Sequence, residues 1–526
     1  MKKSFLYIIA IVMLLAAQSC TDWLDLKPEA EIVLDEYWQS ETDVESMLAS
    51  CYRSLTEPAV ISRMIVWGEL RSDNLTSGFS TGYDLQRILD GDILPTNSYA
   101  SWGAFYTTIN YCNTLLYYAP LVLERDNNFT QADLNRVKAE ALAIRSLAYF
   151  YLVRTFRDVP YIVTPSIDDA QDYNVPKTEG KVIIQKLIED LKTAKMYARV
   201  DFGNKKHNKG RFTQSSVSAL LADIYLWDKQ YDKCIEECDN VLTNSKLSMV
   251  DGSIKLSLVY YVGNSDESIF ELQFDEQGMR NTTVMNFYGM MGDIAGELAF
   301  PATRAYDDEA TQLFRGAYSP FAYPKTTTLI ESSNDIRAKE SYNLQTGSGG
   351  IYYITKYACM SRSVSSTSKS SYNYSSTTAN WIVYRLPEIY LMKAEALVEL
   401  EGENNFRDAI KLVNKTYLRS NEGSDSLYIA NYSTKTTLRE LVFREKQREF
   451  LFEGKRWFDL VRLSERDGNT SALNLLVEQK TSNTNAVVGA QVLDAMYMPI
   501  SKWELSANPN LKQNPYYQEE NSTSTR

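Results

Sequence analysis

Residues 441–463 read LVFREKQREFLFEGKRWFDLVRL, a stretch in which many charged side chains stand beside many aromatic and aliphatic ones. Arg, Glu, Lys and Gln are good helix formers, so the stretch predicts a helix, a break at Gly454 and a second helix. Glu445, Glu449 and Glu453 are spaced four residues apart and share one helical face. Because an unpaired buried charge is strongly destabilising, we expect this segment to lie against the core with its charges paired.

The same glutamates allow a catalytic interpretation, which the neighbouring cations disfavour. Retaining glycosidases hold two carboxyl groups about 5 Å apart and need one of them with a raised pKa. Nearby cations would instead keep both pKa values low. These cations are Arg444, Arg448, Lys455 and Arg456. A structural ion-pair network is therefore the favoured interpretation.

The order of these residues resembles a family signature. The pattern R-E-x-x-R-E-x-x-x-E-G-x-R-W-F-D-L-x-R over residues 444–462 is similar to the C-terminal signature of the SusD/RagB family. YRLPEIYLMKAEA at 384–396 and NPNLKQNPY at 508–516 resemble further stretches of that family. Its members are surface lipoproteins of Bacteroidota that capture glycans or other nutrients beside a TonB-dependent outer-membrane transporter. The resemblance spans the mature chain and is weakest between residues 246 and 380.

Composition narrows the class of protein. The 526 residues carry a net charge of −12, which argues against a nucleic-acid partner because phosphates require a basic face. The chain has one histidine, His207, whereas most hydrolytic and metal chemistry relies on histidine. We therefore expect no catalytic triad, metal site or cofactor. The 36 tyrosines and 8 tryptophans suit core packing, and equally carbohydrate stacking or interface contacts.

The N-terminus is predicted to be a targeting segment. Lys2 and Lys3 precede an apolar run over residues 5–17 that is too short for an ordinary transmembrane helix. Cys20 follows a small residue and resembles the lipidated cysteine of a bacterial lipobox. We expect a signal peptide over residues 1–19 and acyl chains on Cys20 that anchor the protein to the outer membrane, exposed at the cell surface. A plain secreted protein with a fortuitous cysteine is the alternative.

The remaining cysteines are predicted to be small buried apolar residues. Their number is odd, so at least one stays unpaired within the chain, and a single histidine makes a metal site with them unlikely. These residues are Cys51, Cys112, Cys234, Cys238 and Cys359.

Paired helical patterns predict a mainly α fold with a tetratricopeptide-repeat-like scaffold. Residues 213–242 read as two antiparallel helices around a turn at 228–230, with small and aromatic residues at repeat-like spacing. The pattern recurs at 384–417 and, more loosely, at 136–155 with 182–197. Stacked pairs of this kind form a scaffold. We expect an N-terminal helical part over 20–245, a loop-rich, partly irregular insertion over 246–380, and a C-terminal helical part over 381–526.

Two regions carry the candidate ligand-binding residues. Residues 66–98 are predicted to be loop-rich, with exposed polar and aromatic groups. In the insertion, residues 268–274 alternate like a strand, residues 364–378 predict an exposed mobile loop, and residues 381–391 predict the return of helix. Residue type and loop context select Trp67, Asp73, Asn74, Tyr83, Tyr288, Arg304 and Tyr306.

The family resemblance implies a binding role without chemistry on the ligand. We expect a non-catalytic lipoprotein that binds an oligo- or polysaccharide through aromatic rings and polar groups. It would deliver the glycan to a SusC-like TonB-dependent transporter in the outer membrane. The same capture role for a peptide or another nutrient is an alternative, because aromatic grooves also bind peptides. A lipid-anchored glycoside hydrolase is a further alternative, which would need two carboxylates with opposed environments in a cleft.

Overall fold

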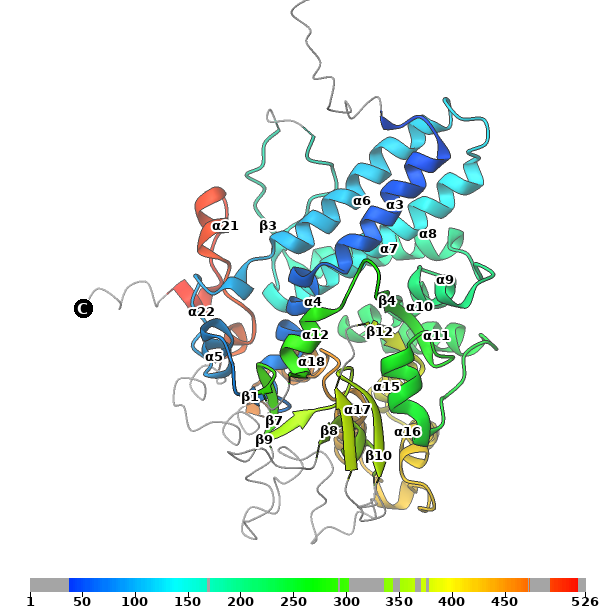
Figure 1. Ribbon diagram of the computed structural model, residues 1–526, viewed down its shortest axis with the longest axis vertical. Helices are drawn as coiled ribbons and strands as arrows, with labels where there is room; N and C mark the ends of the chain where they lie inside the picture. Colours follow the sequence, from blue (N-terminus) through cyan, green and yellow to red (C-terminus); the bar gives the residue numbers. More distant parts are fainter. Residues whose placement is uncertain are drawn as a thin grey trace, which may run out of the picture.

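The computed structural model describes residues 37–167, 171–291, 294–301, 335–343, 351–364, 370–374, 378–471, 473 and 492–518. Helices dominate these residues, and the strands are short; several of them lie together in the lower half of the view in Figure 1. The predicted mainly α architecture is therefore confirmed.

Three helical hairpins form the scaffold. They pair α7 (Gln131–Phe156) with α8 (Gly180–Tyr197), α10 (Gln214–Trp227) with α11 (Tyr231–Leu242), and α15 (Leu386–Leu400) with α16 (Glu403–Ser420). Helix α8 packs against α10, and α11 packs against α15, so the hairpins stack in sequence order. The helices occupy the positions of the three predicted repeat-like pairs, and the turn at 228–230 joins α10 to α11.

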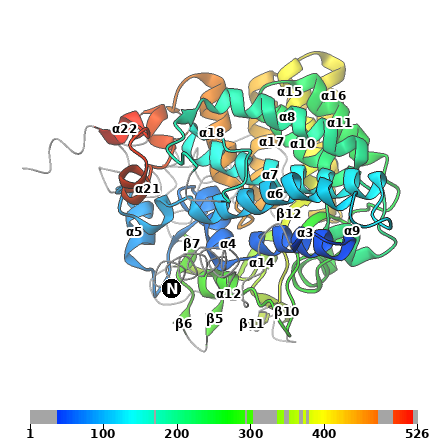
Figure 2. The ribbon, with the colours of Figure 1, turned by 90° about the horizontal axis from the view of Figure 1, so that it is seen from above.

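Helix α7 is the central element of the N-terminal part. Its first turn is closed by a capping box, in which the Thr130 hydroxyl accepts from the Asp133 amide and the Asp133 carboxylate accepts from the Thr130 amide. Its alanines leave room for neighbouring helices to approach closely. These neighbours are α3 (Glu41–Leu55), α6 (Gly103–Val122) and α8, which run beside α7 in Figures 1 and 2.

The C-terminal part contains the helix, glycine and helix predicted from residues 441–463. Helix α17 (Lys435–Phe450) and helix α18 (Arg456–Asp467) are joined through Gly454, whose φ of 71° is readily adopted only by glycine. This turn and the start of α18 pack against η1 (Val66–Leu70), a π-helical segment that continues α4 (Pro58–Ile65). A Cβ on Gly68 would stand 1.8 Å from the Gly454 carbonyl oxygen, so two backbones meet here without a side chain between them.

The insertion and its borders supply most of the strands in the described chain. Strand β4 (Ser268–Leu272) confirms the strand predicted over 268–274 and pairs antiparallel with β12 (Trp381–Arg385). The prediction that helix resumes at residue 381 is wrong for these five residues. All five are buried, and their aromatic and β-branched side chains suit a strand with a backbone partner. The helix begins at Leu386, where Pro387 fits its first turn.

The insertion also contributes three strands to a small four-stranded sheet. Its order is β1 (Thr76–Ser77), β7 (Leu298–Pro301), β9 (Ile351–Ile354) and β8 (Tyr342–Asn343). Strands β10 (Cys359–Val364) and β11 (Ser370–Tyr374) form a separate antiparallel pair. The predicted loop over 364–378 is therefore wrong for residues 370–374, while 365–369 and 375–377 lie outside the described residues.

Short elements complete the described chain. The short strand pairs are β2 (Val159–Pro160) with β3 (Lys177–Thr178) and β5 (Met290–Met291) with β6 (Ile294–Ala295). The short helices are α5 (Tyr83–Leu89), α9 (Lys205–Gly210), α12 (Thr282–Tyr288), α14 (Arg337–Ser341), α21 (Lys502–Ala507), α22 (Pro515–Gln518), η2 (Ser98–Ala100), η3 (Gly252–Ile254), η4 (Leu256–Val262), η6 (Ile429–Asn431) and η7 (Leu493–Met496). Within the described ranges, none of the helices has both the length and the apolar character needed to cross a bilayer.

Candidate ligand-binding site

Trp67, the first candidate, lies inside the fold rather than at the surface. Its side chain is 1% exposed, and its ring stacks 4.9 Å from the ring of Phe105. Its indole N–H donates to the Tyr99 carbonyl at 2.9 Å. The expectation of an exposed ring is wrong because η1 carries this tryptophan into the helical core, where it has no surface to offer a ligand.

Asp73 and Asn74 are likewise buried and join distant parts of the chain. The Asp73 carboxylate accepts from Arg456 Nε and Gln447 Nε2, both at 2.9 Å. The Asn74 amide donates to Glu69 Oε1 at 2.7 Å, and its oxygen accepts from Gln447 Nε2 at 2.9 Å. These polar side chains therefore hold the segment after η1 against α17 and α18, and the prediction of exposure is wrong for both.

The insertion candidates divide into one described residue and two that are not. Tyr288 ends α12, is 1% exposed, and packs 5.9 Å from the Phe452 ring. Its buried hydroxyl has no hydrogen-bond partner among the described residues. Arg304 and Tyr306 lie outside the described residues, as does Cys20.

Tyr83 is the described candidate that does stand at the surface. It opens α5 and is 71% exposed. The Arg87 guanidinium, one turn later, lies 5.8 Å from its ring centroid and also pairs with Asp92 at 2.7 Å. The ring is therefore flanked by a fixed cation and faces solvent.

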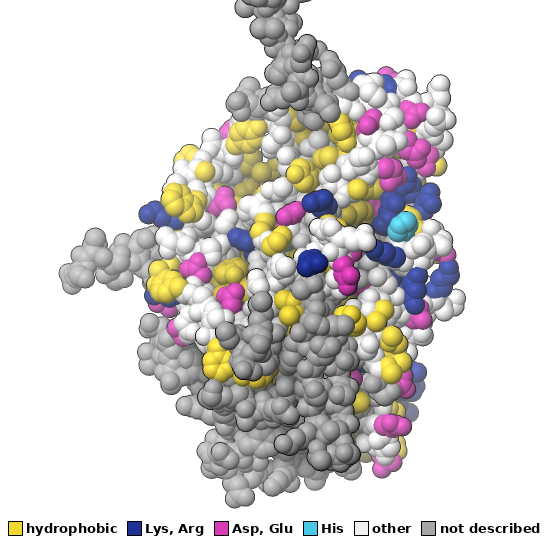
Figure 3. All heavy atoms as spheres, in the orientation of Figure 1, with side chains coloured by type: hydrophobic (Ala, Val, Ile, Leu, Met, Phe, Trp, Pro, Cys, Tyr) yellow, Lys and Arg dark blue, Asp and Glu magenta, His cyan; other side chains and the backbone are white. Residues whose placement is uncertain are grey.

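Two further rings extend this surface. Phe79 is 49% exposed, and its ring centroid lies 6.4 Å from that of Tyr353 on β9. We call Phe79, Tyr83 and Tyr353 the aromatic face. Figure 3 shows hydrophobic side chains at the surface around α5 and β1, on the border of the grey atoms.

The loop that carries Phe79 is fixed by backbone contacts to the insertion. Strand β1 pairs with β7 through Thr76 opposite Ala299 and Ser77 opposite Leu298. Next along the chain, the Gly78 amide donates to the Glu297 carbonyl at 2.9 Å, and the Thr81 hydroxyl donates to the same oxygen at 2.6 Å. Any Cβ on Gly78 would stand 2.2 Å from the Gly296 carbonyl oxygen. The face is thus built jointly by two segments more than 200 residues apart in sequence.

A carboxylate and a cation accompany the rings. Partial burial raises the pKa of the Glu297 carboxyl, and a hydrogen bond from the Gly82 amide opposes that shift. Burial, and secondarily the charge of Glu297, raises the pKa of Tyr99 to about 12. With Arg87, these groups place hydrogen-bond donors and acceptors around flat apolar rings, a combination that suits hydroxylated ligands with apolar faces.

The sequence interpretation missed Phe79 and Tyr353. The sequence did contain a signal for Phe79, which stands in the run TSGFSTG at 76–82. The small polar residues around it show neither a helical nor a strand pattern, so nothing predicts that this phenylalanine is buried. Tyr353 carried no such signal, since its position depends on the pairing of β7 with β9.

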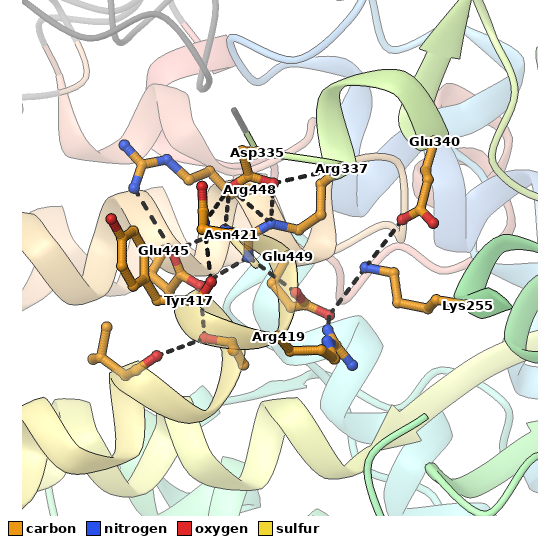
Figure 4. A network of polar contacts seen from close by, with 12 residues as sticks. Lys255, Asp335, Arg337, Glu340, Tyr417, Arg419, Asn421, Glu445, Arg448 and Glu449 are labelled. Atoms are coloured by element: carbon orange, nitrogen blue, oxygen red, sulfur yellow. Dashed lines mark hydrogen bonds and ion pairs between the residues drawn. The ribbon is translucent and has the colours of Figure 1, made fainter. Parts of the chain in front are cut away.

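Glu445, Glu449 and Glu453 take part in a buried ion-pair network, and Figure 4 shows the part around Glu445 and Glu449. Arg337 donates to Glu445 at 2.8 Å and to Glu449 at 3.0 Å, and Arg419 donates to Glu449 at 2.5 Å. Arg385 donates to Glu453 at 2.7 Å. The predicted structural network is therefore confirmed.

Most of the cations that satisfy these glutamates come from outside residues 441–463. Arg385 and Arg419 belong to the second half of the scaffold. Lys255, Arg337 and Lys356 belong to the insertion, and all three are at most 2% exposed. The network therefore attaches the insertion to α17.

The pKa shifts in this network do not suit acid–base catalysis. Burial alone would raise the pKa of Glu449, but Arg419, Lys255, Arg385 and Arg337 together hold it well below its ordinary value. Likewise Arg385 and Lys356 overcome burial and lower the pKa of Glu453 to about 2. A general acid needs a raised pKa, so these two carboxylates act as fixed negative charges.

The described cysteines and carboxylates do not form a reactive or metal-binding cluster. Cys51, Cys112, Cys234 and Cys238 are buried free thiols, as expected. The side chain of Cys359 is not among those that the structure describes. Across the described part of the chain, no group of three or more His, Cys, Asp or Glu side chains is placed to hold a metal ion.

Fold and surface together define a class: a helical-repeat scaffold that presents an aromatic face at the edge of a β-rich insertion. A family model described as "SusD family" matches residues 279–517, and one described as "Starch-binding associating with outer membrane" matches residues 22–226. The chain belongs to the SusD/RagB family.

Individual relatives agree over nearly the whole chain. SusD-like protein P38 of Formosa agariphila is 23% identical over 547 residues, which cover 98% of each chain. SusD-like protein P2 of the same organism is 25% identical over 480 residues, covering 86% of this chain and 89% of the relative. A SusD superfamily protein from Bacteroides vulgatus is 22% identical, superposes with a TM-score of 0.71, and covers 91% of this chain and 99% of its own.

A second solved structure adds to the picture of the fold. It is described as a putative sugar binding protein from Bacteroides vulgatus, is 21% identical and has a TM-score of 0.67, with 91% of this chain and 99% of that chain covered. At this identity the likeness shows that the fold is shared.

Proposed function

We propose that this protein is a non-catalytic surface lipoprotein that binds an oligo- or polysaccharide and delivers it to a SusC-like TonB-dependent transporter in the outer membrane. The observation that carries the proposal is the aromatic face, with Phe79 49% and Tyr83 71% exposed on a loop fixed to the insertion. Apolar rings that gather in one patch, unlike rings exposed singly, mark binding surfaces.

Chemistry supports a carbohydrate at this face. Ring faces pack on the C–H surfaces of sugars, while Arg87 and Glu297 offer planar groups that match neighbouring hydroxyls. The family model described as starch-binding and the putative sugar binding protein from Bacteroides vulgatus point to the same ligand class. We further propose that residues 246–380 contribute to ligand binding through β7 and β9, and that Cys20 carries the lipid.

The test is a screen of the chain from Thr21 onward against a polysaccharide panel. Affinity electrophoresis reports binding, and reducing-sugar release reports cleavage. We expect one glycan class to retard the protein without release of sugar. Phe79→Ala and Tyr83→Ala should each weaken that binding about tenfold, the loss of about 1.4 kcal/mol of ring contact.

The matched control is Tyr428→Ala, which removes a ring that is 59% exposed beside η6, on the loop between α16 and α17. This variant should bind like the wild type. Release of reducing sugar would overturn the non-catalytic proposal, and equal binding by wild type, Phe79→Ala and Tyr83→Ala would remove the aromatic face from it. Binding of peptides in place of glycans would support the alternative nutrient.

A further inference from the structure

A cleft lies where the helical hairpins meet the C-terminal part. It is a cleft of about 410 Å³, within the usual size of small-ligand sites. Its lining comes from the end of α7, the start of α8, the turn between α10 and α11, helix α18 and Tyr497. We call it the hairpin cleft.

One wall of the hairpin cleft is held by a strained backbone. Arg157 ends α7 with a φ of 65° and a ψ of −72°, outside the ordinary regions for a residue with a Cβ. Its guanidinium donates to Asp494 at 2.5 Å and lies 5.3 Å from the Tyr497 ring centroid. Asp158, next in sequence, accepts from the Gly180 amide at 2.9 Å. This corner is therefore rigid before any ligand arrives.

Charge in the hairpin cleft is balanced. The cations are Arg157, Lys181, Lys229 and Arg462, and the anions are Asp158, Glu179, Asp228 and Glu465. Four charges of each sign leave the lining without a net charge. The lining contains both hydrogen-bond donors and acceptors, which suits a neutral ligand rich in hydroxyl groups.

Several polar groups in the hairpin cleft remain available. Trp227, the last residue of α10, is half-buried with its ring edge-on to Phe150 at 6.1 Å. Among the described residues, no partner receives a hydrogen bond from its indole N–H, and neither the Glu179 carboxylate nor the Lys181 ammonium has an ion-pair partner. The Trp227 indole N–H, the Glu179 carboxylate and the Lys181 ammonium line the same cleft and can therefore hydrogen-bond a ligand there.

We infer that the hairpin cleft is a second carbohydrate-binding site, which takes a neutral sugar against Trp227 while Glu179 and Lys181 bond its hydroxyls. The inference rests on the proposed glycan-binding function and adds a second site to it. A long glycan that spans both sites on one protein chain would bind bivalently. Its affinity would then exceed that of a short oligosaccharide by roughly 10²-fold or more.

The test measures stoichiometry and polymer affinity separately. Isothermal titration of the wild type with a short oligosaccharide of the glycan class found in the panel should give two molecules bound per chain. Trp227→Phe keeps a packed ring but removes the N–H, and Glu179→Gln changes an exposed carboxylate, so both variants should fold. Each should lose the second binding event and weaken polymer binding at least tenfold. Trp503→Phe, at a tryptophan 76% exposed on α21, is the matched control.

The outcomes separate this inference from the proposed function. A wild type that binds one oligosaccharide, with Phe79→Ala and Tyr83→Ala abolishing it and Trp227→Phe without effect, would overturn the second site and leave the aromatic face intact. Loss of one site in Trp227→Phe with the other site still present would support the inference. A wild type that binds no glycan would overturn both.

Discussion

Replacement of Arg385 by Met should destabilise the protein more than any exposed charge substitution. Arg385 is 0% exposed and donates to Glu267 at 2.8 Å, to Glu453 Oε1 at 2.7 Å and Oε2 at 2.9 Å, and to Glu449 Oε1 at 2.5 Å. It also donates to the Glu449 carbonyl at 2.7 Å. Methionine fills a similar volume but leaves three buried carboxylates one cation short.

The size of the destabilisation depends on which cations still pair with each carboxylate after the substitution. Glu267 still pairs with Arg419 at 2.7 Å, and Glu453 still pairs with Lys356 at 2.7 Å. No carboxylate is left without a cation, so the costs do not simply add. We expect the loss typical of one broken buried pair, about 3–5 kcal/mol of unfolding free energy. That is a large part of the roughly 5–15 kcal/mol by which native proteins are stable.

Urea unfolding at pH 7, followed by circular dichroism at 222 nm, measures the effect. Arg407→Met is the matched control, because Arg407 and Glu403 form an i,i+4 pair whose side chains are 55% and 74% exposed. This control should lie within about 0.5 kcal/mol of the wild type. The unfolding free energy of Arg385→Lys should lie between those of Arg385→Met and Arg407→Met, because lysine keeps the positive charge but lacks the planar guanidinium that binds carboxylates bidentately. An Arg385→Met variant within 1 kcal/mol of wild type would refute the reasoning.

Two further predictions concern acid and close backbone packing. The pKa of Glu453 is lowered to about 2 in the fold, so its stabilisation is complete above its unfolded pKa and disappears as pH falls from about 4.5 towards 2, a loss of roughly 3 kcal/mol. The urea midpoint should fall over that range, and an unchanged midpoint at pH 3 would contradict this. Gly68→Ala places a Cβ 1.8 Å from the Gly454 carbonyl oxygen and should lower the melting temperature by the equivalent of about 2–3 kcal/mol. Gly103→Ala, whose nearest neighbour would be 3.8 Å away, should change it little.

Local pattern was sufficient for the scaffold. The spacing of small and aromatic residues located three helical hairpins, and the turn at 228–230 fell where α10 gives way to α11. Periodicity works best for α8, α11 and α16, because each of these helices buries one face and the sequence records that contact as a repeat of three and four residues. The pattern failed at residues 381–385, because a strand with both faces buried is as apolar as a buried helix. Only the pairing with β4 shows that these residues form a strand.

The candidate site was much harder to predict. Trp67 looked exposed because residues 66–98 were expected to be loop-rich. Asp73 and Asn74 looked exposed because they follow Arg71 and Ser72 in a polar run, yet both are bonded by Gln447, more than 370 residues away. Burial at those positions depends on pairing that local composition does not encode. The expected exposure of Tyr83 is confirmed, because an aromatic residue in a polar stretch has few apolar neighbours to pack against. Phe79, four residues earlier, could have been chosen on the same grounds.

By itself the sequence determined the family, the helical hairpins and the need for the glutamates of 445–453 to be paired, because periodicity and charge density are local properties. Which cations pair with those glutamates was decided by the tertiary structure alone, since Arg337, Lys356 and Arg385 reach them from 64 to 112 residues away. The same holds for the aromatic face, where a loop near residue 80 meets β7 and β9. Such sites exist only after long-range pairing has fixed the backbone, because each segment contributes just one or two of the contacting groups.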